Sequence, residues 1–442
     1  MITEMDANRF ATHSLKDPRV LRILSAALRA VDPAEAVRTH LPQVNGKVYG
    51  LGIGKASIPM LTALAEAMPL SGALAISKHA SPASSADYRP PLPFGYDVSA
   101  TPSLFPVLLG GHPVPNLDSL RAGERALEFV SALSEDDTLV CLISGGGSAL
   151  VTVPYDGITL EDMQTLTSLL LSCGARIDEI NTLRRQLDRV KGGGLARATK
   201  ANVISLILSD VVGSPLEAIA SGPTVPNPTT AEDALAIVKK YRIEEQVPNS
   251  IIKFLESDSL LSDIEKQTSR FQNLIIGDNK LAAQAALEQA EREGFQAEIL
   301  TNELQGEARD VGRDLAHRLR VGVVRKQHPF CWIAGGETTV TIQGDGKGGR
   351  NQELALAAVS EMKDLQNVML ISLATDGEDG PTEAAGAVVT GESAQRAERL
   401  GVDAADHLSR NDAYVFFERL GDLIRTGPSG TNVNDLVFLF AV

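Results

Sequence analysis

Short apolar runs that alternate with helical patterns are the feature that most constrains the fold of this 442-residue chain. Several of these runs are apolar throughout, and turn residues or helix-capping signals bound them. Such runs are typical of parallel strands that helices cover on both faces, so we predict an α/β protein. The predicted strands are Val48–Ile53, Ala73–Ser77, Thr138–Ile143, Val203–Leu208, Asn273–Ile276, Val368–Ala374 and Leu436–Val442.

The length of the chain predicts more than one domain. A chain of 442 residues exceeds what one ordinary hydrophobic core supports, so two or three domains are expected. Residues 241–272 are more polar than their surroundings and carry no strong strand pattern, which marks them as the linker region. We therefore predict an N-terminal domain over residues 1–250 and a C-terminal domain over residues 273–442.

The composition excludes several classes of protein. A hydrophobic fraction of 43% with 22% charged residues is typical of a soluble globular protein. The net charge of −15 argues against nucleic-acid binding, although a locally basic pocket could still bind a small anion. No apolar run is long enough to span a bilayer and the first residues lack a signal-peptide pattern, so we expect no membrane partner and a cytoplasmic location. The three cysteines are too scattered for a disulfide framework or a zinc site.

A glycine-rich stretch that leads to Arg350 predicts a site for a small oxyanion. We expect strand, turn, a second strand at Val340–Gln343, a glycine-rich loop and then a helix that opens at Arg350. Glycines let the backbone approach a ligand, the helix N-terminus adds partial positive charge, and Arg350 adds a rigid fork of donors. The alternative interpretation is a mobile surface loop with a solvated Arg350.

A lysine follows the first predicted strand on a glycine turn. The turn Gly50-Leu51-Gly52-Ile53-Gly54-Lys55-Ala56 imitates the dinucleotide and P-loop fingerprints but satisfies neither. Lys55 stands where the dinucleotide pattern has Gly or Ala, and the P-loop pattern has a longer glycine spacing and Ser or Thr in place of Ala56. Lys55 nevertheless lies at the carboxyl end of a strand, where open α/β sheets bind their ligands. The alternative is a tight turn with an exposed lysine.

The loop Ser144-Gly145-Gly146-Gly147-Ser148 follows the strand Thr138–Ile143. Its glycines would let successive N–H groups converge on phosphate oxygens, and its two serines would add hydroxyls. The alternative is a glycine hinge. By contrast, we expect a mostly solvated basic face before the glycine run Gly192–Gly194. It comprises Arg184, Arg185, Arg189 and Lys191, of which Arg185 and Arg189 are four apart and share a helix face.

Two carboxylates end predicted strands. Asp210 follows the strand Val203–Leu208, and Asp376 follows the strand Val368–Ala374. This position is frequent for a metal ligand or a general base, and two carboxylates beside phosphate loops suggest Mg²⁺. The alternatives are a helix N-cap and an acidic turn. His112 lies on a turn and fits a structural role as well as a catalytic one.

The motifs, taken in order, resemble the glycerate 2-kinases of the MOFRL type from one end of the chain to the other. The number and order of the matching pieces make the resemblance specific, although no single piece does. The pieces are Gly52–Ala56, Gly111–Pro115, Ser144–Ala149, Asn181–Arg184, Lys191–Gly193, Ser209–Val211, Ala220–Thr224, Gly335–Thr338, Gly349–Glu353 and Thr375–Gly377.

The resemblance implies ATP-dependent phosphorylation of D-glycerate at its 2-hydroxyl, with Mg²⁺, to give 2-phosphoglycerate. It also implies a larger Rossmann-like α/β/α N-terminal domain and a smaller α/β C-terminal domain, with the active site in the cleft between them. Family knowledge marks Lys55 and Arg350 as catalytically important. ATP and D-glycerate are then the partners, while the oligomeric state is left open.

The resemblance assigns roles to the remaining residues. Lys55 and Arg350 would neutralise the glycerate carboxylate and the transferring phosphoryl group, and Gly145 to Ser148 would cradle the nucleotide phosphates. Asp210 or Asp376 would hold Mg²⁺ or accept the hydroxyl proton. The remaining residues assigned to cofactor binding are Ser144, Lys191 and Glu337.

The sequence departs from the family pattern at two places. The Asp-Glu that often follows His-Pro-Val-Pro in the family is Asn116-Leu117 here. The family usually has Pro-Gly-Asp where Val212-Gly213-Ser214 stands, so Asp210 would carry more of any metal binding. Two other functions compete with the kinase. One is an NAD(P)H-dependent hydroxypyruvate reductase, which the failed dinucleotide fingerprint at Lys55 argues against. The other is a non-catalytic protein that senses a nucleotide or glycerate.

Overall fold

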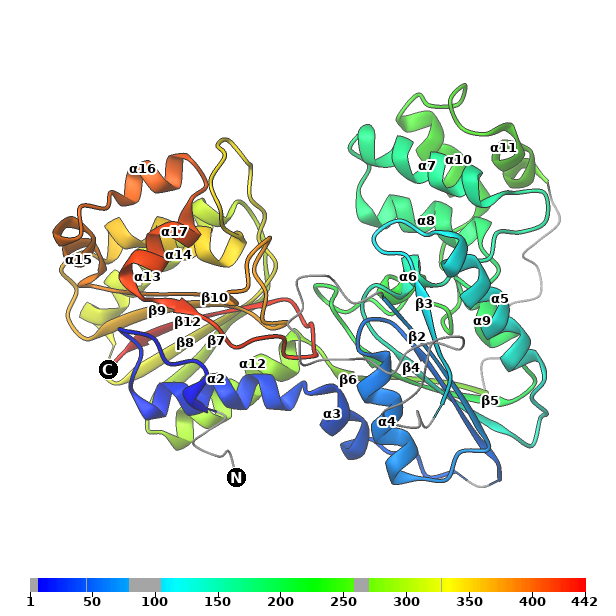
Figure 1. Cartoon of the computed structure of the whole chain (residues 1–442), viewed down its shortest axis with the longest axis horizontal. Helices are drawn as coiled ribbons and strands as arrows, with labels where there is room; N and C mark the ends of the chain where they lie inside the picture. The colour runs from blue at the N-terminus through cyan, green and yellow to red at the C-terminus, as the bar shows by residue number, and fades with distance from the viewer. Residues whose placement is uncertain (1–6, 45, 79–104, 258–269, 327) are drawn as a thin grey trace, which may run out of the picture. The chain divides into compact units, whose positions relative to one another are not determined.

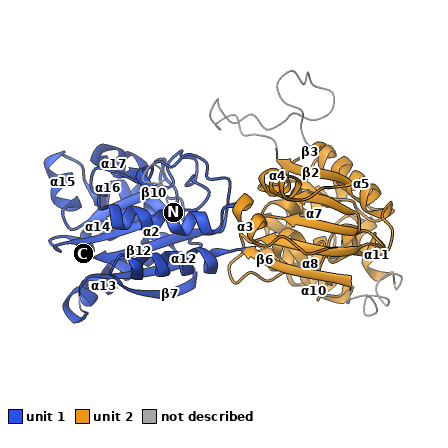
Figure 2. Ribbon diagram, turned by 90° about the horizontal axis from the view of Figure 1, so that it is seen from below, with its two compact units in different colours: residues 1–32, 277–442 blue, residues 33–276 orange. Residues whose placement is uncertain are grey.

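The computed structural model describes residues 7–44, 46–78, 105–257, 270–326 and 328–442. Contacts within the chain form two compact units (Figure 2). Unit 2 is Pro33–Ile276, and unit 1 combines Met1–Asp32 with Gly277–Val442. Among the described residues, no helix is both long and apolar enough to cross a membrane.

The two units differ from the predicted domains at the N-terminus. Helix α2 (Pro18–Ala30) packs along α12 (Asn279–Arg292) of unit 1, and Arg22 forms an ion pair of 2.6 Å with Glu293. The apolar face of α2 is evident in the sequence, but nothing local shows which surface that face covers. The predicted linker also contains structure of its own, because α11 (Asn249–Glu256) packs into a helical cluster of unit 2.

Unit 2 is built on a six-stranded sheet with the strand order β3-β2-β1-β4-β5-β6. Strand β1 pairs in parallel with both β2 and β4, and the pairs β2–β3 and β4–β5 are also parallel. This is the strand order of doubly wound sheets, whose topological switch point lies between β1 and β4. The strands are β1 (Val48–Ile53), β2 (Gly72–Lys78), β3 (Val107–Gly110), β4 (Thr138–Ile143), β5 (Asn202–Leu208) and β6 (Phe271–Gly277).

The helices of unit 2 form two groups (Figure 1). One group connects and covers the strands, while the other packs into a separate helical cluster around Leu166, Leu183 and Ile251. The first group comprises α3 (Pro33–Thr39), α4 (Ser57–Ala67), α5 (Leu117–Ser131), α6 (Gly147–Leu150), α9 (Gly194–Arg197) and the 3-10 turn η1 (Ile219–Ser221). The second comprises α7 (Leu160–Ser172), α8 (Ile177–Leu187), α10 (Ala231–Lys240) and α11.

Unit 1 contains a mixed six-stranded sheet with the order β11-β10-β9-β12-β8-β7. Only β7 and β8 pair in parallel among the registers that the structure describes. The strands are β7 (Gln296–Leu304), β8 (Phe330–Gly336), β9 (Val368–Ala374), β10 (Gly386–Thr390), β11 (Leu423–Ile424) and β12 (Asp435–Ala441). The predicted strand Val340–Gln343 does not form, and Thr339 makes only an isolated bridge to Glu307.

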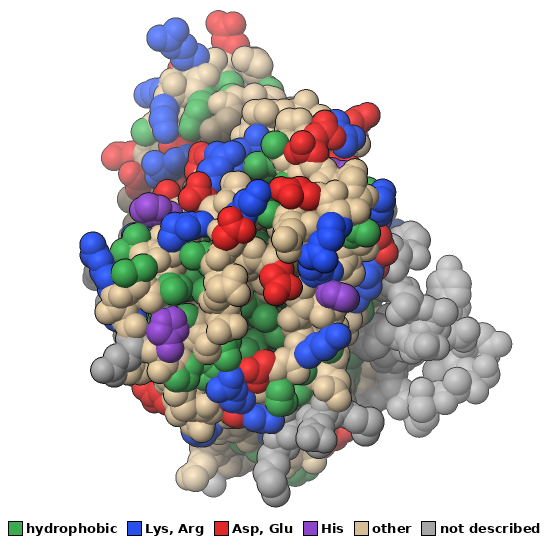
Figure 3. Space-filling model, turned by 90° about the vertical axis from the view of Figure 1, so that its left-hand side faces the viewer, with side chains coloured by type: hydrophobic (Ala, Val, Ile, Leu, Met, Phe, Trp, Pro, Cys, Tyr) green, Lys and Arg blue, Asp and Glu red, His purple; other side chains and the backbone are tan. Residues whose placement is uncertain are grey.

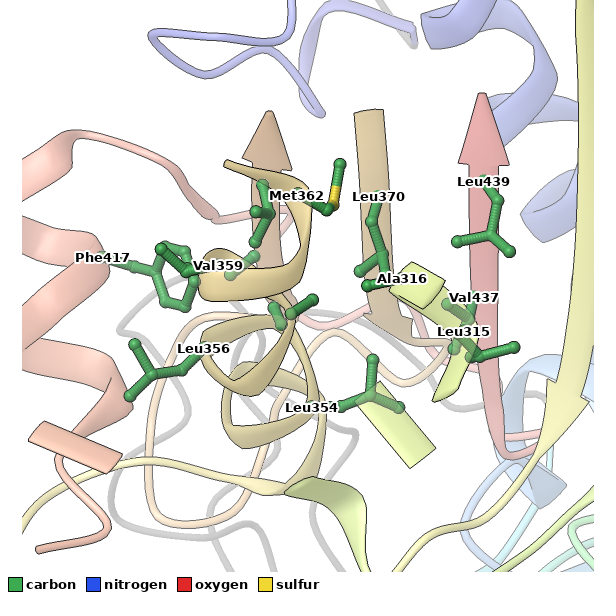
Figure 4. Packing of buried hydrophobic residues seen from close by; sticks show 14 of the residues in the cluster. Leu315, Ala316, Leu354, Leu356, Val359, Met362, Leu370, Phe417, Val437 and Leu439 are labelled. Carbon is green, nitrogen blue, oxygen red and sulfur yellow. The ribbon is translucent and has the colours of Figure 1, made fainter. Parts of the chain in front are cut away.

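The core of unit 1 gathers between this sheet and its helices. Figure 4 shows Leu354 and Val359 of α14 directed toward the same region as Leu315 of α13 and Leu370 of β9. This packing anchors α14 and therefore the residue that opens it. The helices are α12, α13 (Ala308–Arg325), α14 (Arg350–Met362), α15 (Ser393–Arg399), α16 (Ala404–Ser409) and α17 (Ala413–Leu420).

Exposed charges are numerous and many are paired. Acidic and basic side chains are interspersed on the face shown in Figure 3. Lys363 contacts Glu398 at 3.0 Å, and Arg410 contacts Asp406 at 2.8 Å. Exposed pairs of this kind stabilise a fold by only about 0–1 kcal/mol. The informative charges are therefore the buried and half-buried ones near strand ends and helix starts.

Candidate functional site

The turns after β1 and β4 are joined at the switch point of the unit 2 sheet. Ser144 N–H donates to Ile53 O at 2.9 Å, and Lys55 N–H donates to Gly145 O at 2.9 Å. The hydroxyl of Ser144 accepts from Ala56 N–H at 3.0 Å, and Ser144 is only 1% exposed. Ser144 therefore fastens the two turns to each other, which differs from the predicted contact between its hydroxyl and a phosphate.

The backbone of the glycine loop presents unused donors. Within the described ranges, the N–H groups of Gly145, Gly146, Gly147 and Ser148 donate to no protein acceptor. Gly146 is left-handed, with φ of +81°, which a glycine adopts without steric cost. Consecutive free N–H groups in such a turn form a concave site for an anion. The structure thus brings the predicted phosphate loop into a geometry suited to phosphate oxygens.

Three side chains converge on this loop because its residues are glycines. A Cβ added at Gly146 would lie 3.1 Å from Lys55 Cε and 3.2 Å from His112 Cδ2. A Cβ added at Gly145 would overlap the carboxylate of Asp210. Lys55, Asp210 and the glycine loop, which the sequence predicts separately, are therefore neighbours in unit 2, and His112 joins them.

Positive charge is concentrated around the loop. Desolvation, together with the charges of Lys55, Lys78 and Arg184, lowers the pKa of His112 to about 4, although the ring keeps an exposed edge. Neither Lys55 nor Arg184 has a hydrogen-bonded or ion-paired carboxylate in the part of the chain that the structure describes. Cations without such partners in an acidic protein favour binding of an anion at this position.

Asp210 is the acidic member of the group. Desolvation raises the pKa of its carboxyl, and the positive charge of Lys55 opposes that rise. Its side chain accepts no hydrogen bond from another described residue. No three His, Cys, Asp or Glu side chains cluster as metal ligands anywhere in the described ranges. Asp210 therefore places a carboxylate, the kind of ligand that Mg²⁺ takes, beside the glycine loop.

Lys191 lies away from any ligand-accessible surface. It is 2% exposed and forms an ion pair with Asp188, which is fully buried. Its Nζ also donates to Val151 O at 2.9 Å, while Thr152 Oγ1 donates to Asp188 Oδ2 at 2.6 Å. This burial is at odds with the predicted contact between Lys191 and cofactor phosphates, because the Lys191 side chain is 2% exposed and its ammonium group contacts Asp188 and Val151 inside the protein.

The arginines of α8 also differ from the prediction of a solvated face. Arg185 is only 7% exposed, and it donates to Asn227 Oδ1 at 2.9 Å and to Glu217 O at 3.2 Å. Arg184 is half-buried, whereas Arg189 is exposed as expected. The physical reason is that α8 packs its basic face against the segment 217–229, which is distant in sequence.

A strained segment lies under the glycine loop. Ala220 and Ser221 have φ values of +50° and +60°, which non-glycine residues adopt rarely and at some energetic cost. Ser221 Oγ donates to Asn181 Oδ1 at 3.1 Å and lies 2.7 Å from Ser148 Oγ. Backbone strain of this kind often accompanies functional sites. The sequence signals it only through the turn Ser221-Gly222-Pro223.

In unit 1, Arg350 is held by two carboxylates. Asp435 accepts from Nε at 2.5 Å and from Nη2 at 3.1 Å, while Glu337 contacts Nη1 at 2.7 Å. Burial alone would lower the pKa of Arg350, but the hydrogen bonds and charge of Asp435, with the charge of Glu337, hold it above its usual value. Two carboxylates of the protein therefore occupy several of the Arg350 donors that the sequence predicts for a bound anion.

The N-terminus of α14 is also occupied. Asp379 Oδ1 accepts from Asn351 N–H at 3.1 Å, and Asp379 Oδ2 accepts from Gln352 N–H at 2.8 Å. Burial and the nearby charge of Asp435 raise the pKa of Asp379 to about 7. A Cβ at Gly349 would overlap this carboxylate. The anion at this helix end is thus Asp379, which corrects the prediction that the helix N-terminus is open to a ligand.

The glycine-rich loop before α14 is packed against the chain. Gly346 N–H donates to Arg410 O at 2.9 Å, and Lys347 N–H donates to Asp412 Oδ1 at 3.1 Å. The glycines here admit the 410–412 backbone rather than a ligand. Asp376 lies in the same unit, where its Oδ1 accepts from Glu378 N–H at 3.1 Å in the turn after β9.

Sequence reasoning missed Asp379 and Asp435. Asp379 lies in an Asp-Gly turn that was interpreted through Asp376, and Asp435 follows the polar run Asn432-Val433-Asn434 that leads into β12. In the sequence, the only signal for Asp379 and Asp435 is that each is a carboxylate close to a strand. Their partner, Arg350, is far from each of them in sequence.

Comparison with known proteins gives the family. Residues 19–256 match a family described as a domain of unknown function (DUF4147), and residues 330–435 match the MOFRL family. The chain is 38% identical to the glycerate 2-kinase of Pyrococcus horikoshii, over 94% of this chain and 95% of that protein. It is 39% identical to the D-glycerate 2-kinase of Thermotoga maritima, over 97% of this chain and 99% of that protein.

The folds agree as well. The crystal structure of the glycerate kinase of Thermotoga maritima superposes with a TM-score of 0.84 at 38% identity, covering 95% of this chain and 98% of that one. A relative from Agrobacterium vitis, 37% identical over 94% of this chain and 92% of its own length, is provisionally named a hydroxypyruvate reductase. These matches confirm the resemblance and the α/β fold: the chain belongs to the MOFRL family of glycerate kinases, and it is a phosphotransferase with an alcohol group as acceptor.

Proposed function

We propose that this chain is an ATP-dependent glycerate 2-kinase that phosphorylates D-glycerate to 2-phosphoglycerate with Mg²⁺. The observation that carries the proposal is the loop from Gly145 to Ser148, whose free N–H groups lie beside Lys55 at the switch point of a doubly wound sheet. Nucleotide phosphates bind at this position in such folds. The names of the full-length relatives supply the acceptor, glycerate.

Phosphoryl transfer asks the protein mainly for positioning and charge stabilisation. In this proposal the N–H groups of the loop bind phosphate oxygens of ATP, and Lys55 offsets the charge on the group being transferred. The 2-hydroxyl oxygen of glycerate forms the new bond to the γ-phosphorus, and the bond to the leaving ADP oxygen breaks. Asp210 either accepts the hydroxyl proton or holds Mg²⁺, which would neutralise phosphate charge when bound.

Arg350 would bind an anionic group of a substrate, as the sequence predicts. Asp435 engages Nε and Nη2, and Glu337 engages Nη1, so one N–H remains on each Nη atom. A carboxylate or phosphate would use these donors. The cytoplasmic location and the role of Asp376 as a metal ligand stay predictions.

The decisive experiment incubates the protein with ATP, Mg²⁺ and D-glycerate and identifies the product by NMR. Formation of 2-phosphoglycerate is expected, and 3-phosphoglycerate alone would change the assigned position of transfer. Absence of any phosphorylated product would overturn the proposal.

The second candidate is reduction of hydroxypyruvate, and the observation in its favour is the name of the Agrobacterium vitis relative. It predicts NADH or NADPH oxidation with hydroxypyruvate in the absence of ATP. In the structure, Lys55 stands in the turn at the position where a dinucleotide fingerprint has Gly or Ala. The larger side chain opposes the close approach of a dinucleotide pyrophosphate to the backbone of this turn. Cofactor oxidation at a rate comparable to kinase turnover would favour this candidate.

A further inference from the structure

His112 borders the glycine loop of unit 2. A Cβ added at Gly146 would lie 3.2 Å from His112 Cδ2 and 3.1 Å from Lys55 Cε, so the imidazole ring and the lysine side chain flank the same loop residue. We propose that His112 is a ligand-binding side chain of this site, which donates a ring N–H to the oxyanion that the loop N–H groups bind. The identity of that oxyanion as a phosphate of the nucleotide rests on the proposed function.

The chain that carries His112 is held in place from two sides. Gly110, the last residue of β3, packs so closely on the end of α6 that a Cβ there would lie 2.3 Å from Leu150 O. Gly111 N–H donates to Asn116 Oδ1 at 3.1 Å, and Asn116 caps α5. Because α6 begins in the glycine loop, the short helix that follows the loop also positions the strand end before His112.

The ring nitrogens of His112 are available to a ligand. Neither nitrogen has a hydrogen-bonding partner within the described ranges. A neutral imidazole carries one N–H donor and one acceptor nitrogen. The ring donor therefore resembles the N–H groups of Gly145 to Ser148, to which the described protein supplies no acceptor. An oxyanion at the loop supplies acceptors to both.

The charges around the ring predict how this contact responds to pH. Desolvation and the charges of Lys55, Lys78 and Arg184 lower the pKa of His112 to about 4, so the ring is neutral at pH 7 in the ligand-free protein. A bound dianion places negative charge beside the ring and therefore raises this pKa. A group whose pKa rises on binding takes up a proton, so affinity for the anion should increase as pH falls. The carboxyl of Asp210, which also borders the loop, should respond in the same direction, and the test has to separate the two groups.

The test measures binding without turnover. Sulfate is the probe, because it stays a dianion throughout the pH range used. Isothermal titration of the full-length protein at neutral pH should show that His112→Ala binds sulfate about tenfold more weakly than the wild type, since a hydrogen bond to a charged group is lost. His112→Gln keeps an N–H donor and should recover most of that affinity. His317→Gln, which replaces an exposed histidine of α13 in unit 1, is the matched control and should behave as the wild type.

Lowering the pH separates His112 from Asp210. Between about pH 7.5 and pH 5.5, the wild type should gain about two- to fourfold in sulfate affinity relative to His112→Gln, because glutamine cannot take up a proton. Both proteins keep Asp210, so its contribution cancels in this ratio.

An NMR titration places the effect on the ring itself. The protein has seven histidines, and the ring resonance that is absent from His112→Gln belongs to His112. The pKa of this ring should be higher with saturating sulfate than without it. Equal sulfate binding by the wild type and His112→Ala would overturn the proposal, and so would a ring pKa that sulfate leaves unchanged. A protein that shows both effects but fails to phosphorylate glycerate would refute the proposed function and leave this inference standing.

Discussion

The two glycine-rich loops of this protein share a sequence signature and differ in whether carboxylates of the protein itself occupy them. Each loop leads into a helix, and each has a basic side chain, Lys55 or Arg350, beside it. In unit 2 the N–H donors of Gly145 to Ser148 and the side chain of Lys55 have no hydrogen-bonding or ion-pair partner among the described residues. In unit 1 the carboxyl group of Asp379 accepts a hydrogen bond at the N-terminus of α14, and Asp435 forms an ion pair with Arg350. The comparison teaches that a glycine-rich, basic loop indicates an anion site, while the anion can belong to the protein itself.

The sharpest test of this comparison uses two lysines of unit 2, because the resemblance gives Lys55 a catalytic role and Lys191 a role in cofactor binding. Lys191→Ala would leave the fully buried Asp188 without its ion-pair partner. We expect a loss of about 3–5 kcal/mol in the free energy of unfolding, because an uncompensated buried charge is that costly. Urea denaturation followed by circular dichroism measures it. A change below about 1 kcal/mol would mean that Lys191 is not the structural residue described above.

Lys55→Ala should show the opposite behaviour. The side chain of Lys55 has no ion-pair or hydrogen-bond partner in the described chain, so the unfolding free energy should stay within about 0.5 kcal/mol of the wild type. kcat/KM for phosphorylation should fall by roughly two to three decades, as when one preorganised charge donor is lost. Retention of the wild-type kcat/KM would remove Lys55 from the site.

Two glycine substitutions compare the loops directly. Gly145→Ala would crowd the carboxylate of Asp210, which accepts no hydrogen bond from another described residue. Gly349→Ala would crowd the carboxylate of Asp379, which caps the N-terminus of α14. Gly349→Ala should therefore destabilise the fold by about 1–2 kcal/mol, the range for loss of a cap. Gly145→Ala should instead lower kcat with a smaller loss of stability. Thermal unfolding and steady-state kinetics of both variants decide it, and equal stability losses would contradict the comparison.

The pH dependence of stability tests the carboxyl group of Asp379. The pKa of Asp379 is raised to about 7 in the folded protein, above its unfolded value. A raised carboxyl pKa means that the folded state holds the proton more tightly, so stability should fall as pH rises toward 7. We expect this fall between roughly pH 4, where an unperturbed carboxyl titrates, and about pH 7. Asp379→Asn should flatten this dependence in urea titrations, whereas an unchanged slope would assign it to other groups.

Much of the architecture was decided by local sequence. The apolar runs at β1, β4, β9 and β12 predicted strands, and the alternation with helices predicted the α/β class, because burial of a strand or helix face needs a pattern that is visible within a few residues. The glycine loop at Gly145 to Ser148 was predicted because its run of glycines directly follows an apolar strand, which is also visible within a few residues. Lys55 and Asp210 were identified because carboxyl ends of parallel strands meet at one edge of a sheet.

Tertiary structure alone decided which charges were neutralised and which surfaces were covered. Asp435 meets Arg350 from a position 85 residues away, and Asp379 reaches Asn351 from 28 residues away. Likewise, α2 packs on unit 1, and Arg185 packs on the segment 217–229, through contacts that no local pattern encodes. Electrostatic partners are set by distance in space, which sheet topology creates, whereas strand and helix signals are set by periodicity along the chain. The sequence therefore determined where hydrogen-bond donors and carboxylates lie at strand ends and helix starts. Only the fold determined which of these groups pair with each other inside the protein and which could still bind a ligand.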